Sequence, residues 1–193
     1  MRPARRLTGT YADAGLVAYV DESYDTRPGG GYVLAAVLAP GDAAPLRDQL
    51  GALRLPGQDR LHFRHEEDKR RILLAEAIAD LDLVMVAAVG LARPGKSTPT
   101  RLRGRCLHRL YQELAVVDVV VFESRGGRPD RRDTSVLTGI ARPSAPPMVA
   151  FARARDEPML WVPDILAGAV LHDVVRGDPR YRAALGPVRV VRL

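Results

Sequence analysis

The stretch GLVAYVDES at residues 15–23 decides the fold, because it is an apolar run that ends in acidic residues. Its two faces are equally apolar up to Val20, which is typical of a strand buried inside a sheet. A glycine-rich turn, TRPGGG at residues 26–31, leads directly into a second apolar run, GYVLAAVLA at residues 31–39. So short a return predicts that the two runs form an antiparallel pair.

Outward from this pair, helical patterns alternate with further apolar runs, and this order is typical of an α/β fold with parallel strands. We expect a mixed sheet with antiparallel first strands, parallel later strands and helices on both faces. The run at 81–92 is the best candidate for the strand beside the first. Further strands are expected at 60–63, 116–124, 146–154 and 187–193, helices at 44–53, 65–81, 99–115 and 163–175, and a polar loop at 125–133.

The bulk composition is that of one globular domain. The chain has 193 residues, of which 47% are hydrophobic and 27% charged, enough to bury a full core. We expect a flexible N-terminal tail at residues 1–13 and a single domain at 14–193. A single cysteine, Cys106, excludes a disulfide framework. The sequence has no run of 18 apolar residues and no secretory signal, so we expect a cytoplasmic protein that has no membrane partner.

Three acidic residues stand where catalytic carboxylates would be placed. Asp21 and Glu123 each close a buried run, and Asp164 opens the last helix directly after Pro163. If the two runs are parallel, their acids share the edge where α/β sheets form sites. Carboxylates about 4 Å apart repel by roughly 4 kcal/mol at an effective dielectric near 20, and Mg²⁺ or Mn²⁺ would remove that repulsion. The alternative is that each acid is a solvated cap: Asp164 suits a helix N-terminus on its own.

A set of short motifs adds a resemblance to a known family. AYVDES at 18–23, LHF at 61–63 and PDILAGAV at 163–170, in this order, resemble the family called domain of unknown function 3800, over residues 16–175. Tyr24 and Pro163 depart from the family pattern, which has glycine and alanine there. The resemblance implies a ribonuclease H-like fold and metal-dependent phosphodiester hydrolysis. It also implies catalytic roles for the metal ligands Asp21, Glu123 and Asp164 and for their assistants Glu22 and His62.

The net charge is +6 and the pI about 10.0, and arginine is well suited to phosphate. The same excess can equally reflect an arginine-rich composition without a nucleic-acid partner. Two basic groups are candidates for nucleic-acid binding: Arg101 and Arg105 on one helix face, and Arg125, Arg128 and Arg131 in the polar loop after Glu123. Each group could instead be simply solvated.

Three functions remain open from the sequence. The first is a two-metal nuclease that acts on DNA or RNA. The second is a nucleic-acid-binding or assembly module on the same fold with a decayed site. The third is a hydrolase of a small phosphate ester or nucleotide, which a narrow, closed pocket would favour over an open groove. The sequence also leaves a homodimer open.

Overall fold

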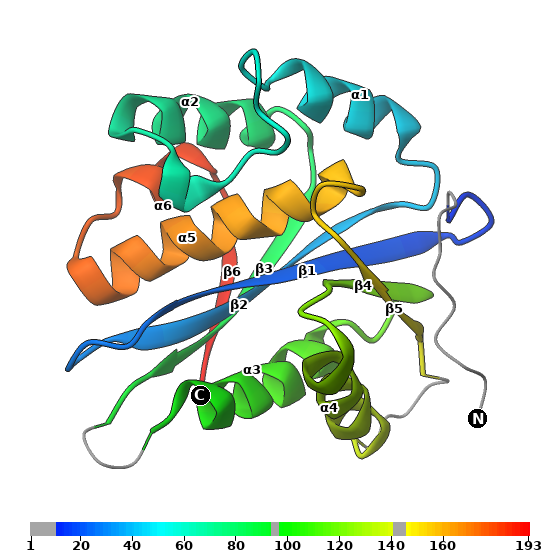
Figure 1. The fold of residues 1–193 in the computed structure, drawn as a ribbon, viewed down its shortest axis with the longest axis vertical. Helices are drawn as coiled ribbons and strands as arrows, with labels where there is room; N and C mark the ends of the chain where they lie inside the picture. Colours follow the sequence, from blue (N-terminus) through cyan, green and yellow to red (C-terminus); the bar gives the residue numbers. More distant parts are fainter. Residues whose placement is uncertain (1–10, 94–96, 141–145) are drawn as a thin grey trace.

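The computed structural model describes residues 11–93, 97–140 and 146–193, and its centre is a six-stranded mixed sheet (Figure 1). The strands lie in the order β5-β4-β1-β2-β3-β6. Their bounds are β1 (Leu16–Asp25), β2 (Gly31–Pro40), β3 (Val84–Leu91), β4 (Val119–Glu123), β5 (Met148–Ala152) and β6 (Arg189–Arg192). The expected strands at 116–124, 146–154 and 187–193 are thereby confirmed.

The first two strands form the expected antiparallel pair, with Leu16 opposite Pro40 and Asp25 opposite Gly31. β3 is antiparallel to β2, whereas the pairs β1–β4, β4–β5 and β3–β6 are parallel. The expectation that the run at 81–92 lies beside the first strand is wrong. β3 pairs with β2, and the helix that follows it carries the chain across to β4, which pairs with β1. Glu123 therefore ends the strand next to Asp21.

Helices cover both faces of the sheet, as the sequence predicts (Figure 1). One face carries four helices and the other carries two. On the first face lie α1 (Ala44–Ala52), α2 (Asp68–Ala79), α5 (Trp161–Arg176) and α6 (Arg180–Ala184); on the second lie α3 (Pro99–Glu113) and α4 (Gly127–Thr138). Two 3-10 turns, η1 (Phe63–His65) and η2 (Pro158–Leu160), complete the described part.

The side chains of β1 alternate between the two faces, as those of any strand must. Val17 and Tyr19 belong to the core under α5, whereas Ala18 and Val20 belong to the core under α3. The segment Pro158–Arg176 is long and apolar enough to cross a membrane by length and composition alone. Because 72% of its apolar window is buried inside the protein, this helix forms the centre of the first core.

Three local expectations are wrong. Residues 60–63 do not form a strand; η1 begins at Phe63 instead, and the His62 side chain caps it by accepting the Arg64 N–H at 3.4 Å. The polar loop expected at 125–133 is mostly the helix α4, which Gly126 permits by turning the chain at φ 86°. The helix α6 was not expected. Residues 1–10 of the expected tail lie outside the described residues, and Tyr11 is buried edge-to-face against Tyr19.

Candidate active site

Asp21 lies near the carboxyl end of β1, on the face covered by α5, and is only 5% exposed. Burial raises the pKa of its carboxyl well above the usual range, and the negative charges of Glu123, Asp164 and Glu22 raise it further. The backbone N–H of Glu22 donates to Oδ1 at 2.7 Å and opposes this only in part. The three acids that the sequence singles out therefore act on one another through a low-dielectric site.

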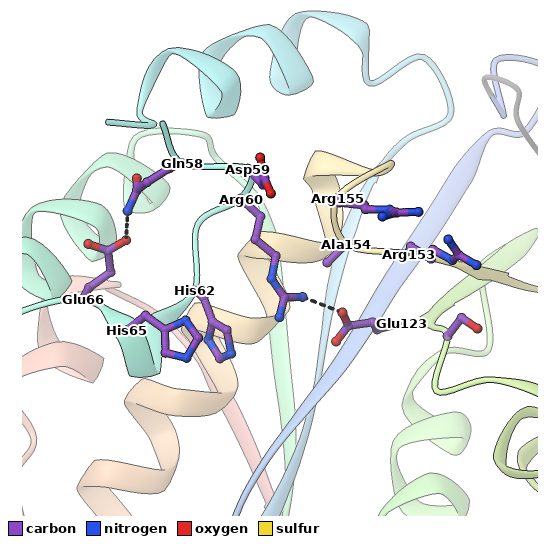
Figure 2. A pocket seen from close by; sticks show the side chains of 11 residues that line it. Gln58, Asp59, Arg60, His62, His65, Glu66, Glu123, Arg153, Ala154 and Arg155 are labelled. Atoms are coloured by element: carbon purple, nitrogen blue, oxygen red, sulfur yellow. Dashed lines mark hydrogen bonds and ion pairs between the residues drawn. The ribbon is translucent and has the colours of Figure 1, made fainter. Parts of the chain in front are cut away.

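Glu123 is the last residue of β4 and lies on the same face of the sheet as Asp21. Its Oε1 accepts a hydrogen bond from Nη1 of Arg60 at 2.8 Å (Figure 2). Arg60 lies between α1 and η1, and its side chain is 37% exposed. A cation thus already neutralises one of the three carboxylates. The sequence analysis missed Arg60, although it directly precedes the LHF motif that carries the resemblance.

Asp164 lies in the first turn of α5, where the partial positive charge of the helix N-terminus stabilises a carboxylate. Its Oδ2 accepts the backbone N–H of Phe63 at 2.7 Å and lies 3.3 Å from Nδ1 of His62. The turn that supplies both groups packs directly on the helix. A Cβ on Gly168 would lie 2.3 Å from Cδ1 of Phe63. The LHF motif and the glycine of the PDILAGAV motif are therefore two halves of one contact.

His62 makes two contacts through one atom. Nδ1 can approach Asp164 as a donor only when it carries a proton, and it can accept the Arg64 N–H only when it does not. The two contacts belong to different protonation states. The neighbouring His65 ring lies with its centroid 4.3 Å from that of His62 (Figure 2). His62 is thus placed to gain or lose a proton beside Asp164.

Two adjoining hollows share His62 and Glu123. One, of ≈ 530 Å³, also contains Asp21 and Asp164. The other, of ≈ 580 Å³, extends away from the acids past Arg60 (Figure 2). Arginines line both: Arg27, Arg64, Arg71 and Arg176 in the first, and Arg60, Arg153 and Arg155 in the second. The acids therefore lie inside an extended, arginine-lined surface hollow.

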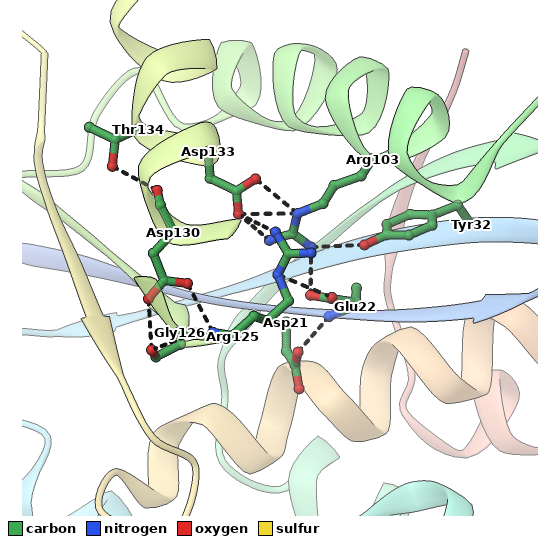
Figure 3. A network of polar contacts seen from close by, with 10 residues as sticks. Asp21, Glu22, Tyr32, Arg103, Arg125, Gly126, Asp130, Asp133 and Thr134 are labelled. Carbon is green, nitrogen blue, oxygen red and sulfur yellow. Dashed lines mark hydrogen bonds and ion pairs between the residues drawn. The ribbon is translucent and has the colours of Figure 1, made fainter. Parts of the chain in front are cut away.

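The structure places the Glu22 side chain on the opposite face of the sheet from Asp21, because neighbouring residues of a strand alternate. Glu22 pairs with Arg103 at 2.6 Å (Figure 3). Arg103 is 5% exposed and also bonds Asp133 and the Tyr32 hydroxyl, at 2.6 and 2.8 Å. Glu22 is thus held in a buried ion-pair network.

The expected nucleic-acid-binding arginines also lie apart from the acids. Arg101 and Arg105 are exposed on α3, and Arg128 and Arg131 are exposed on α4; both helices cover the face opposite Asp21. Arg125 bonds Asp133 at 2.8 Å within the buried network (Figure 3). The segment expected to reach over the acids is a helix packed on the other side. The arginines that share the hollows with the acids were not predicted.

The donor set at the acids fits a hard divalent cation, because Asp21, Glu123 and Asp164 supply carboxylate oxygens and one of them is deeply buried. Within residues 11–93, 97–140 and 146–193, however, no group of three or more His, Cys, Asp or Glu side chains is arranged to hold a metal ion. Arg60 occupies an oxygen of Glu123, and Phe63 and His62 occupy one of Asp164. A metal would have to replace Arg60.

Comparison with known structures identifies the fold as ribonuclease H-like. Two crystal structures of Bst-RNase HIII match: a mutant (TM-score 0.59, 16% identity, 96% of this chain, 61% of that one) and a Mn²⁺ complex (0.54, 16%, 89%, 56%). RNase HII of Archaeoglobus fulgidus, in a PCNA complex, matches at TM-score 0.55 and 18% identity (88% and 86% covered), and ribonuclease H2 of Pyrococcus horikoshii at 0.58 and 14% (84% and 74%).

The predicted fold class is confirmed by these neighbours. This chain spans 61% and 56% of the length of the two Bst-RNase HIII chains. No protein-family model matches the sequence, and a search of curated proteins finds no match. The resemblance to domain of unknown function 3800 therefore stays a prediction within the ribonuclease H-like fold.

Proposed function

We propose that this protein is a metal-dependent phosphodiester hydrolase that acts on DNA or RNA. The observation that carries the proposal is Asp21, a buried carboxyl whose pKa is raised by burial and by Glu123 and Asp164. A site that concentrates uncompensated carboxylates is costly for the fold unless a dication neutralises it. The Mn²⁺ complex among the structural neighbours supports the same ion for this chain.

Asp21, Glu123 and Asp164 would hold Mg²⁺ or Mn²⁺, which would supply charge neutralisation and activation of water when bound. The chain's own groups prepare this site. The Phe63 N–H fixes the orientation of Asp164, and Arg60 balances the charge of Glu123 until the ion replaces it. His62 is placed to hold or release a proton beside Asp164.

The shape of the site favours a polymer over a small ester. The hollow that contains the acids continues past His62 and Glu123 into a second one of similar size. Arginines line both, and a row of cations suits successive phosphates of a backbone. The PCNA complex of one structural neighbour is consistent with an enzyme of nucleic-acid metabolism.

A second candidate is a binding module with a decayed site. The ion pair between Arg60 and Glu123 favours it, because this pair occupies a carboxylate that the metal needs. Such a module would bind nucleic acid in a salt-sensitive manner and would not cleave it when Mn²⁺ is present.

One experiment separates these candidates. The purified protein is incubated with single- and double-stranded DNA, RNA and hybrid substrates, with and without Mn²⁺, alongside Asp21→Asn and Asp173→Asn. Asp173 lies on α5 like Asp164, but its side chain pairs with Arg182, so its replacement controls for the loss of an acid. We expect Mn²⁺-dependent cleavage by the parent and by Asp173→Asn, and none by a folded Asp21→Asn. Cleavage that survives in Asp21→Asn refutes the assignment, and binding without any cleavage favours the decayed module.

A further inference from the structure

A separate hollow lies on the other side of the sheet from the acids, between the end of the β1–β2 hairpin and the helices α3 and α4. Its volume is ≈ 310 Å³, at the small end of the range for sites that enclose a small molecule. Asp21 and Glu22 are consecutive residues that face opposite sides of the sheet, so this hollow is distinct from the candidate active site. None of the functions considered above uses it.

One wall of this hollow is aromatic. The rings of Tyr24 and Tyr32 stack with centroids 5.7 Å apart and planes 4° from parallel. Tyr32 is buried, whereas Tyr24 is 43% exposed. Since Tyr32 already fixes the orientation of Tyr24, a flat ring that stacks on Tyr24 would lose little side-chain freedom in doing so.

The opposite wall is cationic. Four arginines and two carboxylates line the hollow, a net excess of two positive charges. Glu22 and Asp133 are engaged by Arg103 and Arg125 in the buried network (Figure 3). In the part of the chain that the structure describes, Arg128 and Arg132 on α4 have no ion pair, and both are exposed. Two arginines without carboxylate partners beside a prearranged network suit a phosphate dianion.

The floor of the hollow is apolar and open. Leu107, Pro129 and Val136 line it together with Gly104. A Cβ added at Gly104 would meet nothing within 4 Å, so this glycine borders empty space. An aromatic wall, an apolar floor and a cationic rim are the features that a base and a phosphate require together.

We propose that this hollow binds a nucleotide unit, with its base stacked on Tyr24 and its phosphate at Arg128 and Arg132. The unit is either a free nucleoside monophosphate or an unpaired nucleotide within a strand, because both present the same base and phosphate. This site does not require the acids of the candidate active site to bind metal or to catalyse.

The test is isothermal titration calorimetry without metal, in the Asp21→Asn background so that a strand stays intact. The probes are adenosine and cytidine monophosphate, a short single-stranded oligonucleotide and inorganic phosphate. The variants are Tyr24→Ala, Tyr24→Phe, Arg132→Gln and Gly104→Leu, with Arg155→Gln as a control in the other hollow. Because these measurements use neither metal nor turnover, they succeed or fail independently of the proposed hydrolase activity.

We expect saturable binding that Tyr24→Phe and Arg155→Gln preserve. Tyr24→Ala should weaken it roughly tenfold, the size of the loss of one stacked base, and Gly104→Leu should block it. Binding of the monophosphates identifies a free nucleotide as the ligand, whereas binding of the oligonucleotide alone identifies a nucleotide within a strand. The proposal is overturned if neither probe saturates the site, or if affinity is unchanged in Tyr24→Ala, Arg132→Gln and Gly104→Leu. It is also overturned if inorganic phosphate binds as tightly as the nucleotides.

Discussion

The backbone N–H of Phe63 donates a 2.7 Å hydrogen bond to Oδ2 of Asp164 and thereby joins two motifs that lie about a hundred residues apart. A main-chain donor fixes a carboxylate more rigidly than a long side chain can, because the turn that carries it is itself packed. Here the packing is the contact of the Phe63 ring with Gly168. The orientation of one candidate metal ligand therefore depends on a glycine one helical turn away.

Replacing Gly168 with alanine should move this turn. The new Cβ would lie 2.3 Å from the Phe63 ring, so we expect a loss of about 1–3 kcal/mol in the free energy of unfolding and weaker Mn²⁺ binding. Urea unfolding and metal titration measure the two effects. Gly104→Ala is the matched control: it too lies in a helix, but in open space, and it should stabilise by about 0.5–1 kcal/mol. Equal behaviour of the two variants would contradict the role given to Gly168.

Arg60 should compete with the metal for Glu123. Removing its guanidinium in Arg60→Gln leaves Glu123 free, and exposed ion pairs contribute about 0.2–1 kcal/mol. We therefore expect the dissociation constant for Mn²⁺, measured by calorimetry, to fall by up to roughly fivefold. Arg155→Gln, whose side chain pairs only loosely with Asp156 at 3.6 Å, should leave it unchanged. Weaker Mn²⁺ binding in Arg60→Gln would show that Arg60 supports the site instead.

Glu22 should matter for stability more than for metal binding, because its carboxylate neutralises the buried Arg103. Glu22→Gln keeps the shape and removes the charge, and Arg103 retains Asp133. We expect a loss of about 1–3 kcal/mol in the free energy of unfolding, with Mn²⁺ affinity within twofold of the parent's, on the order of 0.4 kcal/mol. A normal stability together with abolished metal binding would place Glu22 in the metal site after all.

His172, which lines the hollow of the acids, should make the fold acid-sensitive. Burial, followed by the charges of Arg176 and Arg71, lowers its pKa from 6.5 to about 4. Between these values the unfolded chain binds the proton and the folded one does not, so stability falls as the pH drops from about 6.5 to about 4. His172→Phe, which preserves the ring contacts with Phe63 and Tyr181, should flatten the dependence of unfolding free energy on pH in this window. An unchanged slope would exclude His172 as its source.

The sequence predicts the acids better than their surroundings, for physical reasons. Asp21 and Asp164 are visible because a buried strand ends in acid and a helix begins with one, and both signals are local. The pairing of β4 with β1 is not local, so the neighbour of Asp21 was misassigned. Alternation along a strand alone could have placed Glu22 opposite Asp21. The approach of Arg60 to Glu123 spans 63 residues, and no periodicity reports such a contact.

The segment after Glu123 shows a second limit. Residues 125–133 contain two glycines, a proline and six charged residues, a composition that predicts a loop. In the structure Asp130 accepts the Arg125 N–H and the Ser124 hydroxyl, and Asp133 turns inward to Arg103. These tertiary contacts stabilise a helix whose intrinsic propensity is poor. The same contacts draw Arg125 and its neighbours away from the acids.

The central claim is that Asp21, Glu123 and Asp164 together hold a divalent cation. Its most direct test is an anomalous-scattering map of crystals of this protein soaked in Mn²⁺. The account predicts a strong peak bound by oxygens of all three carboxylates, with Arg60 withdrawn from Glu123. Saturated crystals without such a peak, in which Arg60 still pairs with Glu123, would contradict it.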